Sequence, residues 1–182
     1  MHDDDSRQET PTRTAGADIW LWMRWLLISA VVLVIDQVTK YAVATSFQYN
    51  ESKVILPFFN LVLAYNSGAA FSFLAGASGW QREFFIGVTV VISAVLLWML
   101  RRYHDNQLLA AALTLVLGGA FGNLVDRVMH GHVIDFIQLH AYGYAWPAFN
   151  VADSAICAGA ALLIWDSFCK PSASVATSVK ST

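Results

Sequence analysis

Two aspartates, Asp135 and Asp153, lie in apolar stretches of the sequence. Asp135 stands in the middle of the run 133–137, and Asp153 lies within the run 149–155. A carboxylate next to hydrocarbon is rare and usually functional, because moving its charge out of water costs free energy. Two carboxylates that meet in a low-dielectric site can share one proton. The pair therefore indicates the acid–base chemistry by which aspartic proteases activate water.

The composition places these aspartates in a membrane protein. Of the 182 residues, 57% are hydrophobic and only 13% are charged, whereas a soluble domain carries roughly 25% charged residues. The formal net charge of −2 offers no basic surface for nucleic acid. The length fits one compact bundle better than two domains.

Four segments are apolar enough to cross a membrane, which takes about 20 residues in a helix. They cover residues 19–44, 84–100, 108–129 and 150–168. We therefore expect a membrane protein with an all-α core of four transmembrane helices. The stretch 45–83 has β-branched and aromatic runs separated by turn residues, which predicts a small β-element between the first two helices. Because open strand edges cannot face lipid, this element should lie at or above the membrane surface.

Domain limits and orientation follow from the polar residues outside the helices. We expect one domain over 19–169, disordered tails at 1–18 and 170–182, and an outer loop at 130–149. The side that holds the termini would carry seven basic residues: Arg7, Arg13, Arg24, Arg101, Arg102, Lys170 and Lys180. The other side would carry four: Lys40, Lys53, Arg82 and Arg127. This bias predicts cytoplasmic termini, with the β-element and the outer loop on the extracytoplasmic side.

This topology gathers polar side chains at one end of the bundle. They are Asp36 and Lys40 at the end of the first helix, Asn123, Asp126 and Arg127 at the end of the third, Asp135 just beyond it, and Asn150 and Asp153 at the start of the fourth. Polar residues scattered by chance would rarely converge in this way. We therefore expect a functional site at this end.

Two pairs in this group also have a purely structural interpretation. Asp36 and Lys40, four residues apart on a helix, can form a structural ion pair or can tie the first helix to the site. Asn150 is a favoured helix N-cap, and Asp153 is a favoured first-turn residue. These two could serve only as caps, or Asp153 could also belong to a catalytic pair that shares a proton.

Other segments leave similar alternatives. The turn at 65–71, with Asn66 and Gly68, can be a plain strand turn or a surface that binds an extended peptide by strand addition. Gly118 and Gly122 have the spacing that lets helices approach closely. Arg127 can bind a lipid headgroup or can pair with one of three carboxylates, those of Asp126, Asp135 and Asp153.

The sequence predicts neither a metal nor a cofactor. His130 and His132 flank one glycine, but a catalytic zinc takes three protein ligands. Cys157 and Cys169 would be about 18 Å apart along a helix, which is too far for a disulfide. We expect both cysteines to be small buried side chains.

Five motifs resemble the lipoprotein signal peptidases, or signal peptidase II family, and occur in that family's order. They are DQVTK at 36–40, YNSGAAF at 65–71, GGAFGNLVDR at 118–127, GHVIDF at 131–136 and WPAFNVADS at 146–154. The resemblance covers about residues 20–168. The tails lie outside it.

The resemblance implies a bacterial inner-membrane aspartic endopeptidase with its active site at the periplasmic face. Such an enzyme removes the signal peptide from prolipoproteins that carry a diacylglyceryl group on their lipobox cysteine, and it cleaves just before that cysteine. The family's catalytic aspartates correspond to Asp135 and Asp153. Its supporting residues correspond to Asp36, Lys40, Asn66, Gly68, Asn123, Arg127 and Asn150. The resemblance also implies membrane lipids as partners, globomycin as an inhibitor and, by our expectation, a monomer.

Two other functions are compatible with intramembrane carboxylates. A small proton-coupled transporter also uses them, but its path needs polar residues through the full depth of the membrane. We expect the cytoplasmic half of this bundle to be bare of them. A non-catalytic assembly module, held together by Gly118 and Gly122, is the second alternative.

Overall fold

Four long helices and one small sheet make up the part of the chain that the computed structural model describes, residues 15–68 and 80–169. The helices are α1 (Ala15–Ser46), α2 (Gln81–Tyr103), α3 (Gln107–Met129) and α4 (Val151–Cys169). The strands are β1 (Ser52–Leu56), β2 (Phe59–Asn66), β3 (Val133–Ala141) and β4 (Tyr144–Ala145). The expected tails lie outside the described residues, apart from 15–18, which belong to α1.

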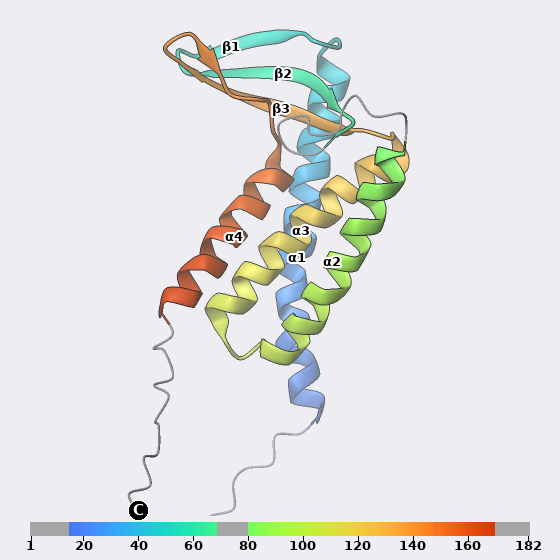
Figure 1. Cartoon of the computed structure of the whole chain (residues 1–182), viewed down its shortest axis with the longest axis vertical. Helices are drawn as coiled ribbons and strands as arrows, with labels where there is room; N and C mark the ends of the chain where they lie inside the picture. The colour runs from blue at the N-terminus through green and yellow to red at the C-terminus, as the bar shows by residue number, and fades with distance from the viewer. Residues whose placement is uncertain (1–14, 69–79, 170–182) are drawn as a thin grey trace, which may run out of the picture.

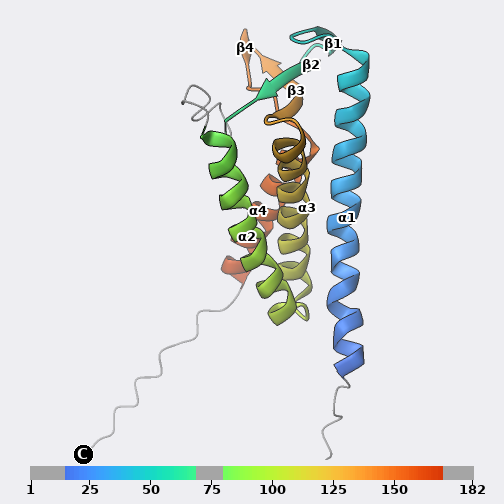
Figure 2. The same ribbon diagram turned by 90° about the vertical axis from the view of Figure 1, so that its right-hand side faces the viewer.

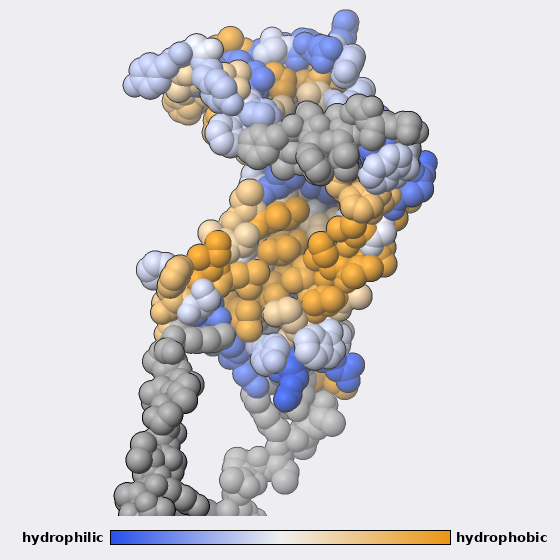
Figure 3. Space-filling model, in the orientation of Figure 1, coloured by the Kyte–Doolittle hydropathy of each residue, from blue (hydrophilic) through white to orange (hydrophobic). Residues whose placement is uncertain are grey.

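All four helices are long and apolar enough to cross a membrane, over Trp22–Ser46, Gln81–Tyr103, Gln107–Met129 and Val151–Cys169. The four predicted transmembrane helices are therefore confirmed, and α1 begins earlier than the expected residue 19. Apolar side chains cover much of the helical surface in the view of Figure 3. Water would not favour such a surface, but a lipid bilayer does.

The sheet lies across one end of the bundle, and this end is called the sheet end below (Figure 1). The start of α1 and the end of α4 both lie towards the opposite end, the far end (Figures 1 and 2). The strands are antiparallel in the order β1-β2-β3-β4. The small β-element is thus where the sequence predicts it, but it is larger than expected.

The additional strand β3 comes from the segment that the sequence analysis treated as an outer loop. It pairs with β2, with Ala64 opposite Asp135 and Asn66 opposite Val133. Ile134 and Phe136 of β3 are buried with Leu63 of β2 in a small apolar core at the end of α1. This burial explains why 133–141 forms a strand, and it places Asp135 within the sheet.

Helix α3 is the centre of the bundle and packs against each of the other three helices. Its glycines permit the close approach that the sequence predicts. A Cβ at Gly118 would lie 2.8 Å from the Ser29 carbonyl oxygen of α1, and a Cβ at Gly122 would lie 2.5 Å from the Asp36 carboxylate. At the far end, α3 and α2 share an apolar cluster that includes Leu96, Leu100, Leu109, Leu113 and Leu117.

We predict that Gly118→Ala lowers the free energy of unfolding by about 1–3 kcal/mol, because the added methyl group collides with α1 backbone. The matched control is Gly87→Ala on α2, where a Cβ would meet nothing within 4 Å. This control should be neutral or more stable by up to about 1 kcal/mol, since alanine favours a helix over glycine. Unfolding of both variants in detergent micelles measures the difference, and equal stabilities would contradict close α1–α3 packing.

Candidate active site

A buried lysine ammonium joins the polar residues at the sheet end. Lys40 Nζ lies 2.8 Å from Asp36 Oδ2 and 2.9 Å from Asp126 Oδ2, and it donates to Asn123 Oδ1 at 3.0 Å. All three charged side chains are at most 2% exposed. A charge buried this deeply requires paired partners, because the cost of removing it from water is otherwise several kcal/mol. The predicted pair of Asp36 and Lys40 is therefore part of a larger ionic cluster.

Both carboxylates of this cluster also hold backbone next to the candidate catalytic aspartates. Asp126 Oδ2 accepts the amide of Ile134 at 3.1 Å, one residue before Asp135. Asp36 Oδ1 accepts the amide of Ala152 at 2.8 Å, one residue before Asp153. The cluster around Lys40 thus ties α1 and α3 to β3 and α4. Of the two interpretations of the Asp36–Lys40 pair, the geometry supports the one that links it to the site.

Asp135 is buried on β3, with 2% of its surface exposed. Its Oδ1 accepts from Asn150 Nδ2 at 2.7 Å, and its Oδ2 accepts from Asn66 Nδ2 at 3.1 Å. Each oxygen of the carboxylate thus accepts from one side-chain amide, one at the end of β2 and one just before α4.

Asp153 lies in the first turn of α4, where Asn150 caps the helix. Asn150 Oδ1 accepts the Asp153 amide at 2.9 Å, and Asp153 Oδ2 accepts the Asn150 amide at 3.3 Å, which is the reciprocal pattern of a capping box. Asp153 Oδ1 also accepts from Asn123 Nδ2 at 2.8 Å. Capping and membership of the site are therefore compatible, because Asn150 caps α4 and bonds to both carboxylates.

The two carboxylates line one cavity of about 1010 Å³, between α2, α3, α4 and the sheet. Figure 3 shows the molecule hollowed between its sheet and its helices. Polar groups of Asn66, Asn123 and Arg127 line the cavity with the aspartates, and most of its other walls are apolar. A cavity with a few convergent polar groups in apolar walls is typical of a binding site.

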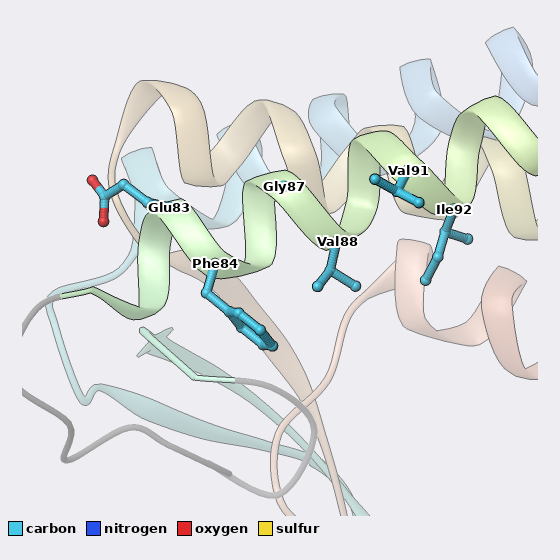
Figure 4. A pocket seen from close by; sticks show the side chains of 6 residues that line it. All are labelled: Glu83, Phe84, Gly87, Val88, Val91 and Ile92. Atoms are coloured by element: carbon cyan, nitrogen blue, oxygen red, sulfur yellow. The ribbon is translucent and has the colours of Figure 1, made fainter.

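A second hollow, of about 430 Å³, lies on an outer face of α2 (Figure 4). Its walls are apolar except for Glu83, whose side chain points away from the helix. It offers no second polar group, so we do not assign chemistry to it.

Arg127 contacts the turn after β2 and not the carboxylates. Its Nη2 donates to the carbonyl oxygen of Gly68 at 3.0 Å, and the Gly68 amide donates to Asn66 Oδ1 at 3.0 Å. The guanidinium lies 5.1 Å from the centre of the Phe85 ring, within range of a cation–π contact. Within the described residues, Arg127 makes none of the ion pairs that the sequence left open. It orients the turn that carries Asn66, the partner of Asp135.

The pKa of Asp135 is raised from 3.8 to about 7. Burial is the largest cause, and the negative charge of Asp153 adds to it. The hydrogen bonds from Asn66 and Asn150 and the charge of Lys40 act in the opposite direction. Asp135 can therefore exchange a proton near neutral pH, as a general acid or base requires.

The structure brings together all the site residues expected from sequence, and it adds two that the supporting set did not include. Asp126 is the second carboxylate on Lys40, and Gln37 Nε2 donates to Asp126 Oδ1 at 2.9 Å and to the Gly122 carbonyl oxygen at 3.1 Å. The sequence analysis placed Asp126 in the polar group at this end but did not count it among the supporting residues. Gln37 gives a weaker signal, because a neutral amide near a helix end is common.

Two expectations about the rest of the bundle are wrong. Both cysteines are exposed on the protein, with Cys157 lining the cavity. The far half is not bare of polar groups, since Asp166 is buried there and accepts from Asn106 Nδ2 at 3.2 Å. Along α3 between Asn106 and Asn123, however, the polar side chains are Gln107 at its start and Thr114, whose hydroxyl bonds to carbonyl oxygens of its own helix. This interval argues against a proton path through the bundle.

Of the histidines in the expected outer loop, His130 and His132 lie in an aromatic cluster, whereas His140 contacts Asn60. His132 lies 4.2 Å from the ring centre of Tyr65, and Tyr65 stacks on Tyr49 at 5.0 Å. The ring centres of His130 and His132 are 6.0 Å apart. Among residues 15–68 and 80–169, no group of three metal-ligating side chains occurs.

We predict that Lys40→Met lowers the free energy of unfolding by about 3–5 kcal/mol, because it leaves two buried carboxylates without their cation. The control is Lys53→Met, which removes a lysine that is 57% exposed and lies 3.7 Å from Glu51. That change should cost at most about 1 kcal/mol. Equal losses in detergent unfolding would show that the buried cluster contributes no more than a surface pair.

We also predict a pH-dependent difference in stability between the wild type and Asp135→Asn. A folded-state pKa raised to about 7 contributes stability below pH 3.8 that is lost as the pH rises through 7. Asparagine cannot ionise, so the variant should gain stability relative to the wild type between pH 5 and pH 8, on the order of a few kcal/mol. Unfolding at both pH values measures this. Parallel curves for the two proteins, or the same trend in the exposed-site control Glu83→Gln, would contradict it.

A family model described as signal peptidase (SPase) II matches residues 28–169. The chain is 54% identical over 142 residues to the lipoprotein signal peptidase of Ralstonia nicotianae, covering 78% of this chain and 82% of that one. It is 49% identical over 165 residues to the enzyme of Cupriavidus necator, covering 88% and 93%. Two solved bacterial membrane enzymes, determined by the in meso method at 2.3 and 1.9 Å resolution, match with TM-scores of 0.72. They are 35% and 32% identical, and the matches cover 85% and 87% of this chain and 89% and 96% of theirs. The chain therefore belongs to the signal peptidase II family, the lipoprotein signal peptidases.

Proposed function

We propose that this membrane peptidase is an aspartic endopeptidase that cleaves diacylglyceryl-modified prolipoproteins just before the lipidated cysteine. Family membership supports removal of the signal peptide from prolipoproteins. The catalytic type, the cleavage point and the roles of individual residues are the proposal. The observation that carries it is the contact of one residue, Asn150, with the carboxylates of both Asp135 and Asp153 at the wall of one cavity.

The two aspartates divide the acid–base work between them. One is ionised and takes a proton from water, and the other is protonated and polarises the scissile carbonyl group. Asp135 can carry a proton near neutral pH, because burial raises its pKa to about 7. Asp153 stands in the first turn of α4, where the helix dipole favours a negative charge. The proton that the water loses then reaches the leaving amine.

The supporting residues act by position. Asn123, Asn150 and Asn66 hold the carboxylates through their amide groups. Lys40 and Asp36 fix the backbone beside them, and Arg127 holds Gly68 and so the turn that carries Asn66. Geometry held this tightly lowers the barrier, because the reacting groups need little reorganisation. No residue in this scheme requires a metal or a cofactor.

The apolar walls of the cavity suit a substrate that is itself held in the membrane. Phe85, Ile92, Val116 and Ile156 line it beside the aspartates. A signal helix and acyl chains would meet such walls with little desolvation cost. The substrate would be anchored by lipid and delivered along the membrane. Globomycin is expected to compete for the same cavity, and the enzyme is expected to act as a monomer.

The site is proposed to lie at the periplasmic face of the inner membrane, with both termini in the cytoplasm. The start of α1 and the end of α4 lie at the far end, away from the sheet and the aspartates. The flanks at the far end also carry the larger number of basic residues, which favour the cytoplasmic side.

We predict that Asp135→Asn and Asp153→Asn each abolish cleavage of a diacylglyceryl-modified precursor, because neither variant can form the proton-sharing pair. A gel-shift assay with purified enzyme in detergent measures cleavage, with wild type plus globomycin as the inhibited reference. Glu83→Gln is the matched control, since it removes an exposed carboxylate from outside the cavity and should retain wild-type cleavage. Near-normal cleavage by folded Asp135→Asn would sink the proposal.

A further inference from the structure

Arg82, in the first turn of α2, joins that helix to the end of α3. Its Nε donates to the carbonyl oxygen of Arg127 at 2.9 Å, and its Nη2 donates to the carbonyl oxygen of Val128 at 2.7 Å. The last carbonyl groups of a helix have no partner within the helix and carry partial negative charge. The Arg127 carbonyl oxygen also accepts the Gly131 amide at 3.2 Å, so the arginine fork from α2 adds charge-assisted bonds to this helix end.

The same turn of α2 contacts the side chain of Arg127. The ring of Phe85, three residues after Arg82, lies 5.1 Å from the Arg127 guanidinium. Helix α2 therefore fixes Arg127 twice, by its backbone through Arg82 and by its side chain through Phe85.

From Arg127 a continuous series of hydrogen bonds leads to the candidate catalytic aspartate. Arg127 Nη2 donates to Gly68, the Gly68 amide donates to Asn66, and Asn66 Nδ2 donates to Asp135, with distances of 3.0, 3.0 and 3.1 Å. Any displacement of the α3 end would move the first of these bonds.

Helix α2 depends on the Arg82 contact near the sheet end, because its buried apolar packing lies at the far end. Its substantial helix packing is against α3. The buried apolar part of that packing, Leu96 and Leu100 against α3 leucines, lies at the far end. Near the sheet end, Phe85, Thr89 and Ile92 line the cavity instead of filling a core. Near the sheet end, the contacts of Arg82 and Phe85 with the end of α3 hold α2, beside the buried Gln81.

We propose that Arg82 is a positioning residue for the peptidase reaction: it pins the start of α2 to the end of α3 and so places Arg127 and the turn that supports Asp135. The proposal rests on the proposed function, in that it concerns the same site. Arg82 does not line the cavity, so its effect on cleavage passes through Arg127.

The first test is a double-mutant cycle on kcat/KM for a diacylglyceryl-modified precursor. Arg82→Gln should lower kcat/KM roughly tenfold to a hundredfold, the scale of a small misplacement of catalytic groups. Arg82→Lys keeps the charge but loses the two-pronged fork, so its kcat/KM should lie between those of Arg82→Gln and the wild type. In an Arg127→Gln background, Arg82→Gln should lower kcat/KM much less than it does in the wild type, because the guanidinium that Arg82 positions is already absent. If the two substitutions lower kcat/KM by independent factors, the proposal is overturned, since that is the result expected when Arg82 only stabilises the fold.

The second test measures the position of α2 without using activity. Spin labels at Glu83→Cys and Met129→Cys, in a background with Cys157→Ser and Cys169→Ser, report the spacing of the two helix ends. Arg82→Gln should lengthen or broaden that spacing. Arg102→Gln, the same change at the exposed far end of α2, should leave both spacing and kcat/KM unchanged. An unchanged spacing in Arg82→Gln, or a changed spacing with wild-type kcat/KM, would overturn the proposal. If the wild type fails to cleave the precursor, the proposed function fails, whereas the spacing still decides whether Arg82 holds α2.

Discussion

The arrangement of the site depends on one buried cation between two anions. Lys40 lies within 2.9 Å of both Asp36 and Asp126, and each of these carboxylates holds the amide one residue ahead of a candidate catalytic aspartate. The free energy of burying these charges is recovered only when all partners are in place. Because two of these partners are backbone amides of β3 and α4, the cluster also fixes β3 and α4 relative to each other. The separation of Asp135 and Asp153 is therefore set by an ionic cluster that stands behind them, and the cluster itself does not line the cavity.

Close packing of helices makes this cluster geometrically feasible. Gly122 gives the Asp36 carboxylate room beside α3, and Gly119 lies against the backbone carbonyl of Ala152 on α4. The small residues of α3 thus bring α1 and α4 near enough for Asp36 of α1 to accept the Ala152 amide of α4. Packing and electrostatics depend on each other here, because a wider bundle would leave Asp126 too far from Lys40 and the Ala152 amide too far from Asp36.

Hydropathy was sufficient to predict the four helices, since lipid requires long apolar segments with internally satisfied backbone. The convergence of polar residues at the sheet end also followed from the order of those segments. Strand β3 was missed because the run around Asp135 is buried and lacks the alternation that marks a half-exposed strand. Its pairing with β2 is a long-range contact that local patterns do not encode. Gln37 was missed as a supporting residue because its importance lies in its partners on α3, which spacing alone does not reveal. Asp126 was placed in the polar group at this end but not among the supporting residues.

The pairing of β2 with β3 also bears on how the protein is made. Its two strands are separated in the chain by two membrane-spanning helices, so the sheet cannot close until both helices have entered the bilayer. Helix α4, which carries Asp153 and the Asn150 cap, leaves the ribosome after everything else in the site. Lys40 and its two anions are therefore synthesised before Asp153, the second candidate catalytic carboxylate. The candidate pair of aspartates is complete only when this last helix packs against α3.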